Sequence, residues 1–294
     1  MEIIKNCNFA VYKTNMKSKI LLILIIILCI NNLSAQEDCF YGHTYLCVGE
    51  KYYIYADVAN IRVRPATTEE IIYKFPAGQE IVINAIHNGE ETSIDGVRGQ
   101  WLYVTTTDGT NREGWLWSNS LSSKQLRRGN VKFVFGINSF SDYKFKGTVK
   151  AIDNGKIVDR KNYELGMEGA MFNNAKIIDN VSLENVKHVV HLSIGGGACM
   201  FPLSDFYFAW LEEKKKLVEL PVAMSVSDAC GVSYTESLSV PSENSGGIYN
   251  LLVKVTQEGT PPEKGDPCDY SKWDWEYKTE LFKWNGEKTV KINH

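Results

Sequence analysis

The sequence lacks any hydrophobic run long enough to cross a bilayer as a helix. Its longest run, residues 20–30, has 11 apolar residues, and as a helix it would rise about 16 Å, roughly half the hydrocarbon thickness. Four lysines precede this run, and a small residue, Ala35, follows it. This layout is typical of a cleaved secretory signal, so we expect export and removal of residues 1–35. An uncleaved N-terminal anchor is the alternative; after cleavage we expect no contact with a membrane.

The sequence also lacks an excess of basic residues. Its net charge is −3, and loss of four lysines and one glutamate with the signal would take it to about −6. Proteins that bind nucleic acid usually carry a basic patch or stripe, so this class of partner is excluded. The chain beyond residue 35 is long enough for one large domain or two medium domains.

Motifs for metal ions and cofactors are absent as well. His188 and His191 are three residues apart in an apparent strand, KHVVHLSI, which places them on opposite faces. Neither lies in an HExxH motif or at zinc-finger spacing, so both are interpreted as structural residues. The glycines at 195–197 are not followed by the Lys-Ser/Thr of a phosphate-binding loop. We therefore predict no metal site, no cofactor and no identifiable catalytic residue.

Five cysteines remain beyond residue 35, and in an oxidising compartment they indicate structural disulfides. Cys39 and Cys47 are close enough in sequence to close a short loop. Cys199 and Cys230 form a plausible second pair, which leaves Cys268 without a partner. Spacing alone does not fix the connectivity. We assign residues 36–49 to a cysteine-containing N-terminal segment.

From residue 50 to residue 122 the chain consists of short alternating segments separated by turn residues, the pattern of an antiparallel β-domain. In Asn60-Ile61-Arg62-Val63-Arg64-Pro65, the apolar and basic side chains alternate, and proline ends the strand. Five short strands in this length suit a small barrel, which leaves few unpaired strand edges.

The segments ANIRVRPATTEEIIYKFPAGQEIVI, QWLYV and GWLWSNSL resemble the bacterial SH3 domain family. Nine residues follow the order and spacing of that family: Asn60, Arg62, Pro65, Gly78, Trp101, Val104, Gly114, Trp115 and Leu121. The resemblance covers about a quarter of the chain, and the loop at 87–99 is longer than the family's usual loop.

The resemblance implies a module of the cell envelope, where some members bind peptidoglycan and others serve only in packing. Exposed aromatic side chains beside arginines could hold an extended peptide or a glycan stem through stacking and cation–π contacts. The candidates for such a face are Tyr53, Tyr55, Arg62, Arg64, Tyr73, Trp101, Tyr103 and Trp117. The alternative is that the tryptophans belong to the core and that the arginines lie on a solvated strand face.

A linker at 123–130 leads to residues 131–294, where the β pattern resumes without a strong helical segment. Asn154-Gly155 and Asn285-Gly286 each stand between two strand-like segments, as in tight hairpins. A third hairpin joins FYFAW to LVEL. These hairpins predict a second antiparallel β-domain, either a sandwich or a set of propeller-like blades, so the expected fold class is all-β.

Three functional hypotheses follow. The first is a non-catalytic exported protein of the envelope that binds peptidoglycan or an envelope protein. The second is a cell-wall hydrolase, since bacterial SH3 domains often accompany cysteine peptidases. Against it, the histidines near Cys199 precede that residue, Pro202 follows it closely, and a thiolate needs a base within reach. The third is an inhibitor or immunity-type protein.

Overall fold

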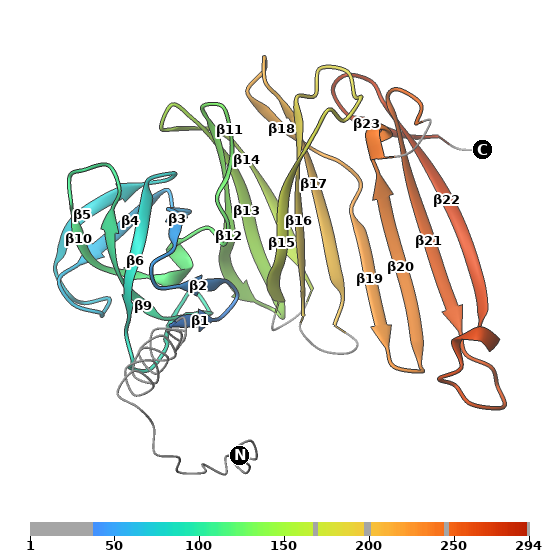
Figure 1. Ribbon diagram of the computed structural model, residues 1–294, viewed down its shortest axis with the longest axis horizontal. Helices are drawn as coiled ribbons and strands as arrows, with labels where there is room; N and C mark the ends of the chain where they lie inside the picture. The colour runs from blue at the N-terminus through green and yellow to red at the C-terminus, as the bar shows by residue number, and fades with distance from the viewer. Residues whose placement is uncertain (1–37, 167–169, 197–200, 244–246, 293–294) are drawn as a thin grey trace, which may run out of the picture. The chain divides into compact units, whose positions relative to one another are not determined.

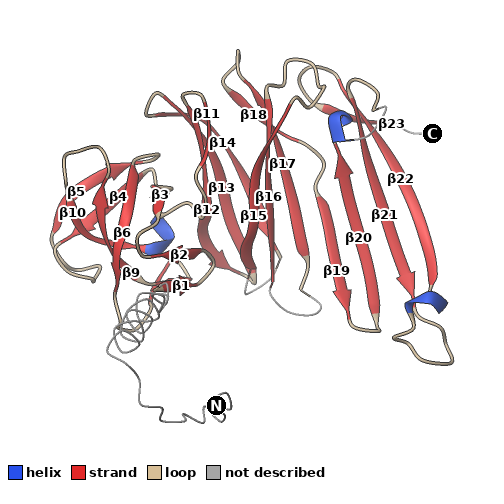
Figure 2. Ribbon diagram, viewed as in Figure 1, coloured by secondary structure: helices blue, strands red, loops and turns tan. Residues whose placement is uncertain are grey.

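The fold was examined in a computed structural model of the chain, which describes residues 38–166, 170–196, 201–243 and 247–292. Strands make up most of these residues, and helical structure is limited to three short 3-10 turns at Ser118–Ser120 (η1), Pro241–Glu243 (η2) and Tyr270–Lys272 (η3) (Figure 2). Every ladder is antiparallel. The predicted all-β fold class is therefore confirmed.

The first large sheet lies within the segment predicted to be SH3-like. Its six strands pair in the order β3-β6-β9-β10-β4-β5. Their bounds are Lys51–Tyr53 (β3), Val58–Arg62 (β4), Ile71–Pro76 (β5), Glu80–Ile86 (β6), Trp101–Thr106 (β9) and Glu113–Trp117 (β10). All six strands contribute apolar side chains to one core, among them Tyr52, Phe75 and Leu116. The sheet thus wraps around its own core, although no ladder joins β3 to β5 among the described residues.

Two small hairpins flank this sheet. Cys39–Tyr41 (β1) pairs with Tyr45–Cys47 (β2), and the two cysteines at the ends of the hairpin form a disulfide, as predicted. Thr92–Ile94 (β7) pairs with Val97–Gly99 (β8) inside the segment 87–99, which was predicted to be a loop.

A four-stranded sheet follows, in the order β11-β12-β13-β14. Its strands are Leu126–Arg128 (β11), Val131–Ser141 (β12), Lys144–Asp153 (β13) and Lys156–Leu165 (β14). The β13–β14 turn is the predicted Asn154-Gly155 hairpin, and both turn residues have the positive φ angles, 49° and 77°, that this tight turn requires.

The last sheet has nine strands, in the order β15-β16-β17-β19-β20-β21-β22-β23, with β18 paired to β17. Their bounds are Ala170–Asp179 (β15), His188–Gly196 (β16), Leu203–Leu211 (β17), Lys216–Glu219 (β18), Ala223–Asp228 (β19), Val232–Ser239 (β20), Leu251–Thr260 (β21), Asp274–Trp284 (β22) and Thr289–Ile292 (β23) (Figure 1). The predicted hairpins at FYFAW–LVEL and at Asn285-Gly286 correspond to β17–β18 and β22–β23.

The four-stranded sheet packs against the beginning of the nine-stranded sheet. Phe133, Phe135 and Val149 from one sheet share a core with Leu192 and Trp210 from the other. Two sheets on one shared core form a sandwich, whereas a propeller has at least four blades of four strands around a channel, an arrangement absent from the described residues. A further core lies around the β15–β16 connection and includes Leu252 and Trp284 from later strands.

The predicted pairing of Cys199 with Cys230 is wrong for Cys230, which forms a disulfide with Cys268, 38 residues further along the chain. Cys230 follows β19 and Cys268 precedes β22, and the sheet order places these strand ends close enough for bonding. Cys199 lies outside the described residues, as do residues 1–35. No described helix has the length and apolar character needed to span a membrane.

Asp38–His294 form one compact unit. The predicted boundaries of the SH3-like domain and of the second β-domain, at residues 50, 122 and 131, therefore stay a prediction.

Candidate functional site

The strongest candidate site lies where the six-stranded sheet meets the outer face of the four-stranded sheet. The segment after β3 supplies Tyr55 and Asp57, and β13 supplies Thr148 and Lys150. Along β13 every second side chain points away from the sandwich core, so Thr148 and Lys150 share one face. Both are nevertheless buried, because Tyr55 and its neighbours cover that face.

Polar side chains form a continuous chain across this contact. The Tyr55 hydroxyl donates to Asn138 Oδ1, the Asn138 amide donates to Thr148 Oγ1 over 2.6 Å, and Thr148 donates to Asn162 Oδ1 over 2.9 Å. The β12–β13 register shifts between Ile137 and Ser139, and such a bulge re-aims the side chain at its centre, here Asn138. Burial raises the pKa of Tyr55, which keeps its hydroxyl protonated as a donor.

Three charged groups lie at one end of this chain. Lys150 Nζ is 2.8 Å from an oxygen of Asp57, and Arg160 Nη1 is 3.1 Å from the other oxygen. Burial alone would raise the pKa of Asp57, but the bonds and positive charges of the two cations hold it below its ordinary value. Two cations face one carboxylate, so the cluster carries one net positive charge.

Lys150 is held by more than its ion pair. It donates to the carbonyl oxygen of Tyr55 over 2.8 Å and lies 4.1 Å from the centre of the Tyr55 ring. Its side chain is only 6% exposed, and burial lowers its pKa. Gly136 makes this arrangement possible, since a Cβ there would stand 2.6 Å from the Tyr55 ring.

Trp117 completes a hollow beside these groups. The hollow has a volume of about 500 Å³ and is lined by Tyr55, Ala56, Asp57, Trp117, Asn119, Ser120, Ile137, Asn138, Thr148, Lys150, Arg160 and Asn162. We call it the Trp117 pocket. Pockets of this size that combine aromatic side chains with a few fixed polar groups are typical of small-ligand sites. Hydroxyl, amide and charged groups line one wall, and a half-buried indole lines another.

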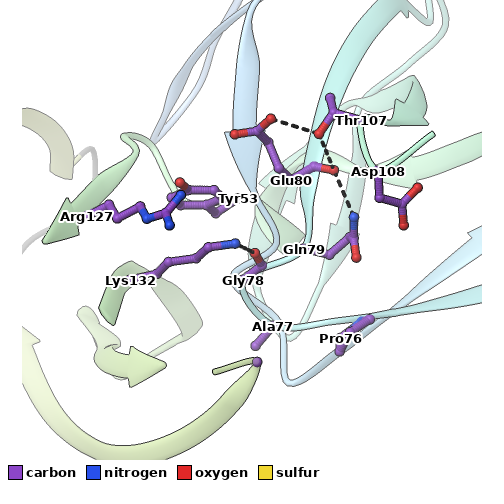
Figure 3. Close-up of a pocket in the computed structure, with 11 residues that line it drawn as sticks. Tyr53, Pro76, Ala77, Gly78, Gln79, Glu80, Thr107, Asp108, Arg127 and Lys132 are labelled. Carbon is purple, nitrogen blue, oxygen red and sulfur yellow. Dashed lines mark hydrogen bonds between the residues drawn. The ribbon is translucent and has the colours of Figure 1, made fainter. Parts of the chain in front are cut away.

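A second hollow, of about 390 Å³, lies around Lys132 and Tyr53. Lys132 donates to the carbonyl of Gly78 over 2.7 Å and lies 4.5 Å from the Tyr53 ring centre. Figure 3 shows Arg127 beside Tyr53 and a hydrogen bond between Thr107 and Glu80.

Burial alone would raise the pKa of Glu80, but the hydrogen bond from Thr107 and the positive charge of Lys51 lower this pKa below its ordinary value. This hollow is the weaker candidate, because it is smaller than the Trp117 pocket and its one aromatic side chain, Tyr53, is buried beneath Lys132.

Three of the predicted binding residues are buried and cannot belong to an exposed aromatic face. Tyr53 and Tyr55 are covered by lysines of β12 and β13, which lie far away in the sequence. Trp101 is buried as well, and its indole donates to Thr92 Oγ1 over 2.9 Å in the inserted β7–β8 hairpin. These positions were wrong as exposed sites, although Tyr55 lines the Trp117 pocket.

Of the other five predicted residues, Trp117 is half-buried and lines the Trp117 pocket. The remaining four lie nearer the surface but outside that pocket. Arg62 is half-buried, bonds the Glu69 carbonyl and stands opposite Trp115 in the sheet, while Arg64 is exposed. Tyr73 is 39% exposed on the edge strand. Tyr103 packs edge-on against Trp115, 5.3 Å between ring centres.

The two histidines are placed as predicted, on one strand with opposite faces. His188 Nδ1 lies 2.7 Å from Asp179, and His191 Nε2 lies 2.8 Å from Asp205. His191 also stacks on Tyr207. Within the described residues, no three metal-ligating side chains gather in one place.

Sequence reasoning missed the polar wall of the pocket. Thr148 and Lys150 stand directly opposite Asn162 and Arg160 in the β13–β14 ladder. The signal was present, because Thr148 and Lys150 are two residues apart, as are Arg160 and Asn162, which places each pair on one face of a strand. The sequence does not reveal that the segment around Tyr55 covers this face of β13, and without that knowledge the polar residues look like an ordinary solvated strand face.

No family model, curated protein or solved structure matches the chain. The resemblance to the bacterial SH3 domain family therefore stays a prediction.

Proposed function

We propose that the protein is an exported, non-catalytic component of the cell envelope that binds peptidoglycan in the Trp117 pocket. The observation that carries the proposal is the pocket itself: an indole beside a row of hydroxyl, amide and charged groups. A sugar ring offers a C–H face to an aromatic side chain and hydroxyl groups that both donate and accept hydrogen bonds. The exposed amides of Asn138 and Asn162 supply groups of both kinds, and the buried Thr148 hydroxyl holds the two amides in place.

The charge of the pocket favours the same ligand. Asp57, Lys150 and Arg160 together carry one net positive charge, and peptidoglycan carries free carboxylates on its peptide stems. Arg160 is about half exposed, so it can contact a ligand without leaving its position. A hydrogen bond from the Arg160 guanidinium to a ligand carboxylate would be charge-assisted and directional, which helps to orient that carboxylate.

Two further features support export. Disulfides persist in oxidising compartments and are rare in the cytosol, and the two described disulfides join Cys39 to Cys47 and Cys230 to Cys268. The basic and apolar character of residues 1–35 is that of a secretory signal.

The proposal is tested by incubating the purified protein with isolated peptidoglycan sacculi and measuring the fraction that sediments with them. Wild type should be retained, and Trp117→Ala should lose most of that retention. Asn162→Ala should weaken retention to a smaller degree, because it removes one polar group of the wall.

Trp115→Ala is the matched control. Trp115 lies two residues from Trp117 on the same strand, has comparable exposure, and does not line the pocket. Circular dichroism would establish that both variants are folded. Wild type that stays in the supernatant, or equal retention of both tryptophan variants, would contradict the proposal.

A further inference from the structure

β22 and β23 form the outer edge of the nine-stranded sheet. β22 pairs with β21 over ten consecutive residue pairs, from Leu251↔Lys283 to Thr260↔Asp274, without a register shift. On its other side, β23 pairs only with residues 281–284. Within the described residues, the segment 274–280 has no partner on that side. We call this segment the open edge.

An open, regular strand edge presents a row of N–H and C=O groups that can pair with another strand. Other edges of the protein carry features that prevent such pairing. β5, at the edge of the six-stranded sheet, ends in Pro76, and its ladder to β4 contains a register shift. Proline and bulges are both known to protect edges. The open edge, with the sequence DWEYKTE, has neither feature, and the only protection that it carries is its charged side chains.

The sequence of the open edge is complementary to itself when two copies run antiparallel. The only register that pairs all seven residues places Tyr277 opposite Tyr277 of the second copy. Glu276 then faces Lys278 of the second copy, and Lys278 faces its Glu276. Moving the centre to Lys278 would instead place lysine opposite lysine and Glu276 opposite Glu280.

The side chains at the centre are exposed, and each makes one contact within its own chain: Gln257 donates to the Tyr277 hydroxyl over 3.3 Å, and Lys278 Nζ lies 3.4 Å from Glu280. Tyr277 is 67% exposed and the Lys278 side chain is 71% exposed. Asp274 would face Glu280, but Glu280 is paired with Lys291, which holds its pKa below the ordinary value, so Lys278 can turn to Glu276 of the second copy. Opposite charges directly across an antiparallel pair stabilise it, and like charges destabilise it.

We infer that two copies of this chain associate through the open edges of β22 in a two-fold symmetric antiparallel pair centred on Tyr277. Such an isologous contact uses the same surface on both copies and closes after two subunits. The two nine-stranded sheets would then continue into each other, and the contact leaves the Trp117 pocket uninvolved.

Sedimentation equilibrium of the purified protein over a range of concentrations tests this inference. Wild type should show a monomer–dimer equilibrium. Lys278→Glu replaces both attractive pairs by repulsive pairs and should raise the dissociation constant by about tenfold or more. The double variant Glu276→Lys/Lys278→Glu exchanges the charges and should restore association.

Lys283→Glu is the matched control, since Lys283 lies on the same strand where β23 already covers it. It should leave the equilibrium unchanged. Tyr277→Cys should form a disulfide-linked dimer on oxidation, because residues opposite each other across an antiparallel pair have Cα atoms about 4.5–5.5 Å apart. Thr279→Cys should not, since it would face Trp275.

A wild type that stays monomeric at every concentration would overturn the inference. A dimer that is insensitive to Lys278→Glu, or a double variant that fails to recover, would overturn the register and with it the proposed contact.

Discussion

Replacing Lys150 by methionine tests how the six-stranded sheet and the four-stranded sheet are held together around the Trp117 pocket. Methionine keeps the apolar stem in place, and it removes the ammonium group. The carbonyl of Tyr55 then loses its 2.8 Å donor, which costs about 1–3 kcal/mol for a buried acceptor. The cation–π contact at 4.1 Å is worth about 0.5–2 kcal/mol.

Two effects reduce this loss. Asp57 is half exposed and keeps its contact with Arg160, so its ion pair contributes little, as is usual for solvated pairs. Methionine also avoids the desolvation of a buried ammonium group. We therefore expect Lys150→Met to lower the free energy of unfolding by about 2 kcal/mol, which is the net of these effects.

Urea unfolding followed by tryptophan fluorescence would measure this value. Lys146→Met is the matched control, because Lys146 lies on the same face of β13 but is exposed, and surface substitutions usually stay within about 0.5 kcal/mol. The pH dependence has a defined sign. Because the pKa of Asp57 is lowered in the folded state, its contribution is present above the ordinary aspartate pKa and is lost as the pH falls through the folded value.

The difference between wild type and Lys150→Met should therefore narrow in acid. An unchanged or higher stability of Lys150→Met at neutral pH would refute the view that the ammonium group of Lys150 holds the Tyr55 segment against β13.

Three further predictions concern the rest of the fold. Replacing both cysteines of the Cys230–Cys268 pair, 38 residues apart, should cost about 3.9 kcal/mol by loop entropy, against about 2.5 kcal/mol for Cys39–Cys47, 8 apart; equal losses in urea unfolding would contradict this ranking. Gly136→Ala should cost about 1–3 kcal/mol, because its Cβ would stand 2.6 Å from the Tyr55 ring, and an unchanged thermal midpoint would refute this packing. Glu236→Gln should destabilise the protein at neutral pH, because Lys254 lies 2.9 Å from this half-buried carboxylate; Lys254 and Tyr234 help to lower its pKa against the effect of burial, so the loss should shrink as the pH falls through the folded value, and a loss independent of pH would count against it.

Local features of the fold were predictable from the sequence. The Asn154-Gly155 turn follows from the ease with which both residues adopt positive φ angles, and Cys39 and Cys47 are close enough in sequence to meet in a hairpin. Alternation of apolar and polar residues marked most strands, because a strand with one buried face must alternate.

The candidate site was not predictable in the same way. Lys150 bonds the Tyr55 carbonyl across 95 positions of sequence, and no local preference encodes which sheet covers the polar face of β13. The same reason explains the error in the cysteine pairing, since Cys230 and Cys268 meet through the order of strands in the nine-stranded sheet. Trp117 was a candidate from the start, but its neighbours in the pocket come from strands that the sequence places elsewhere.

The central claim is that the Trp117 pocket binds peptidoglycan, and NMR of the indole N–H groups tests it most directly. The indole nitrogen of Trp117 is buried and has no hydrogen-bond partner among the described residues, so its signal should report on changes in the pocket. During titration with solubilised peptidoglycan fragments, the Trp117 signal, assigned with Trp117→Phe, should shift saturably while the Trp115 signal stays in place. A Trp117 signal that does not move at saturating fragment, or a shift confined to Trp115, would contradict the claim.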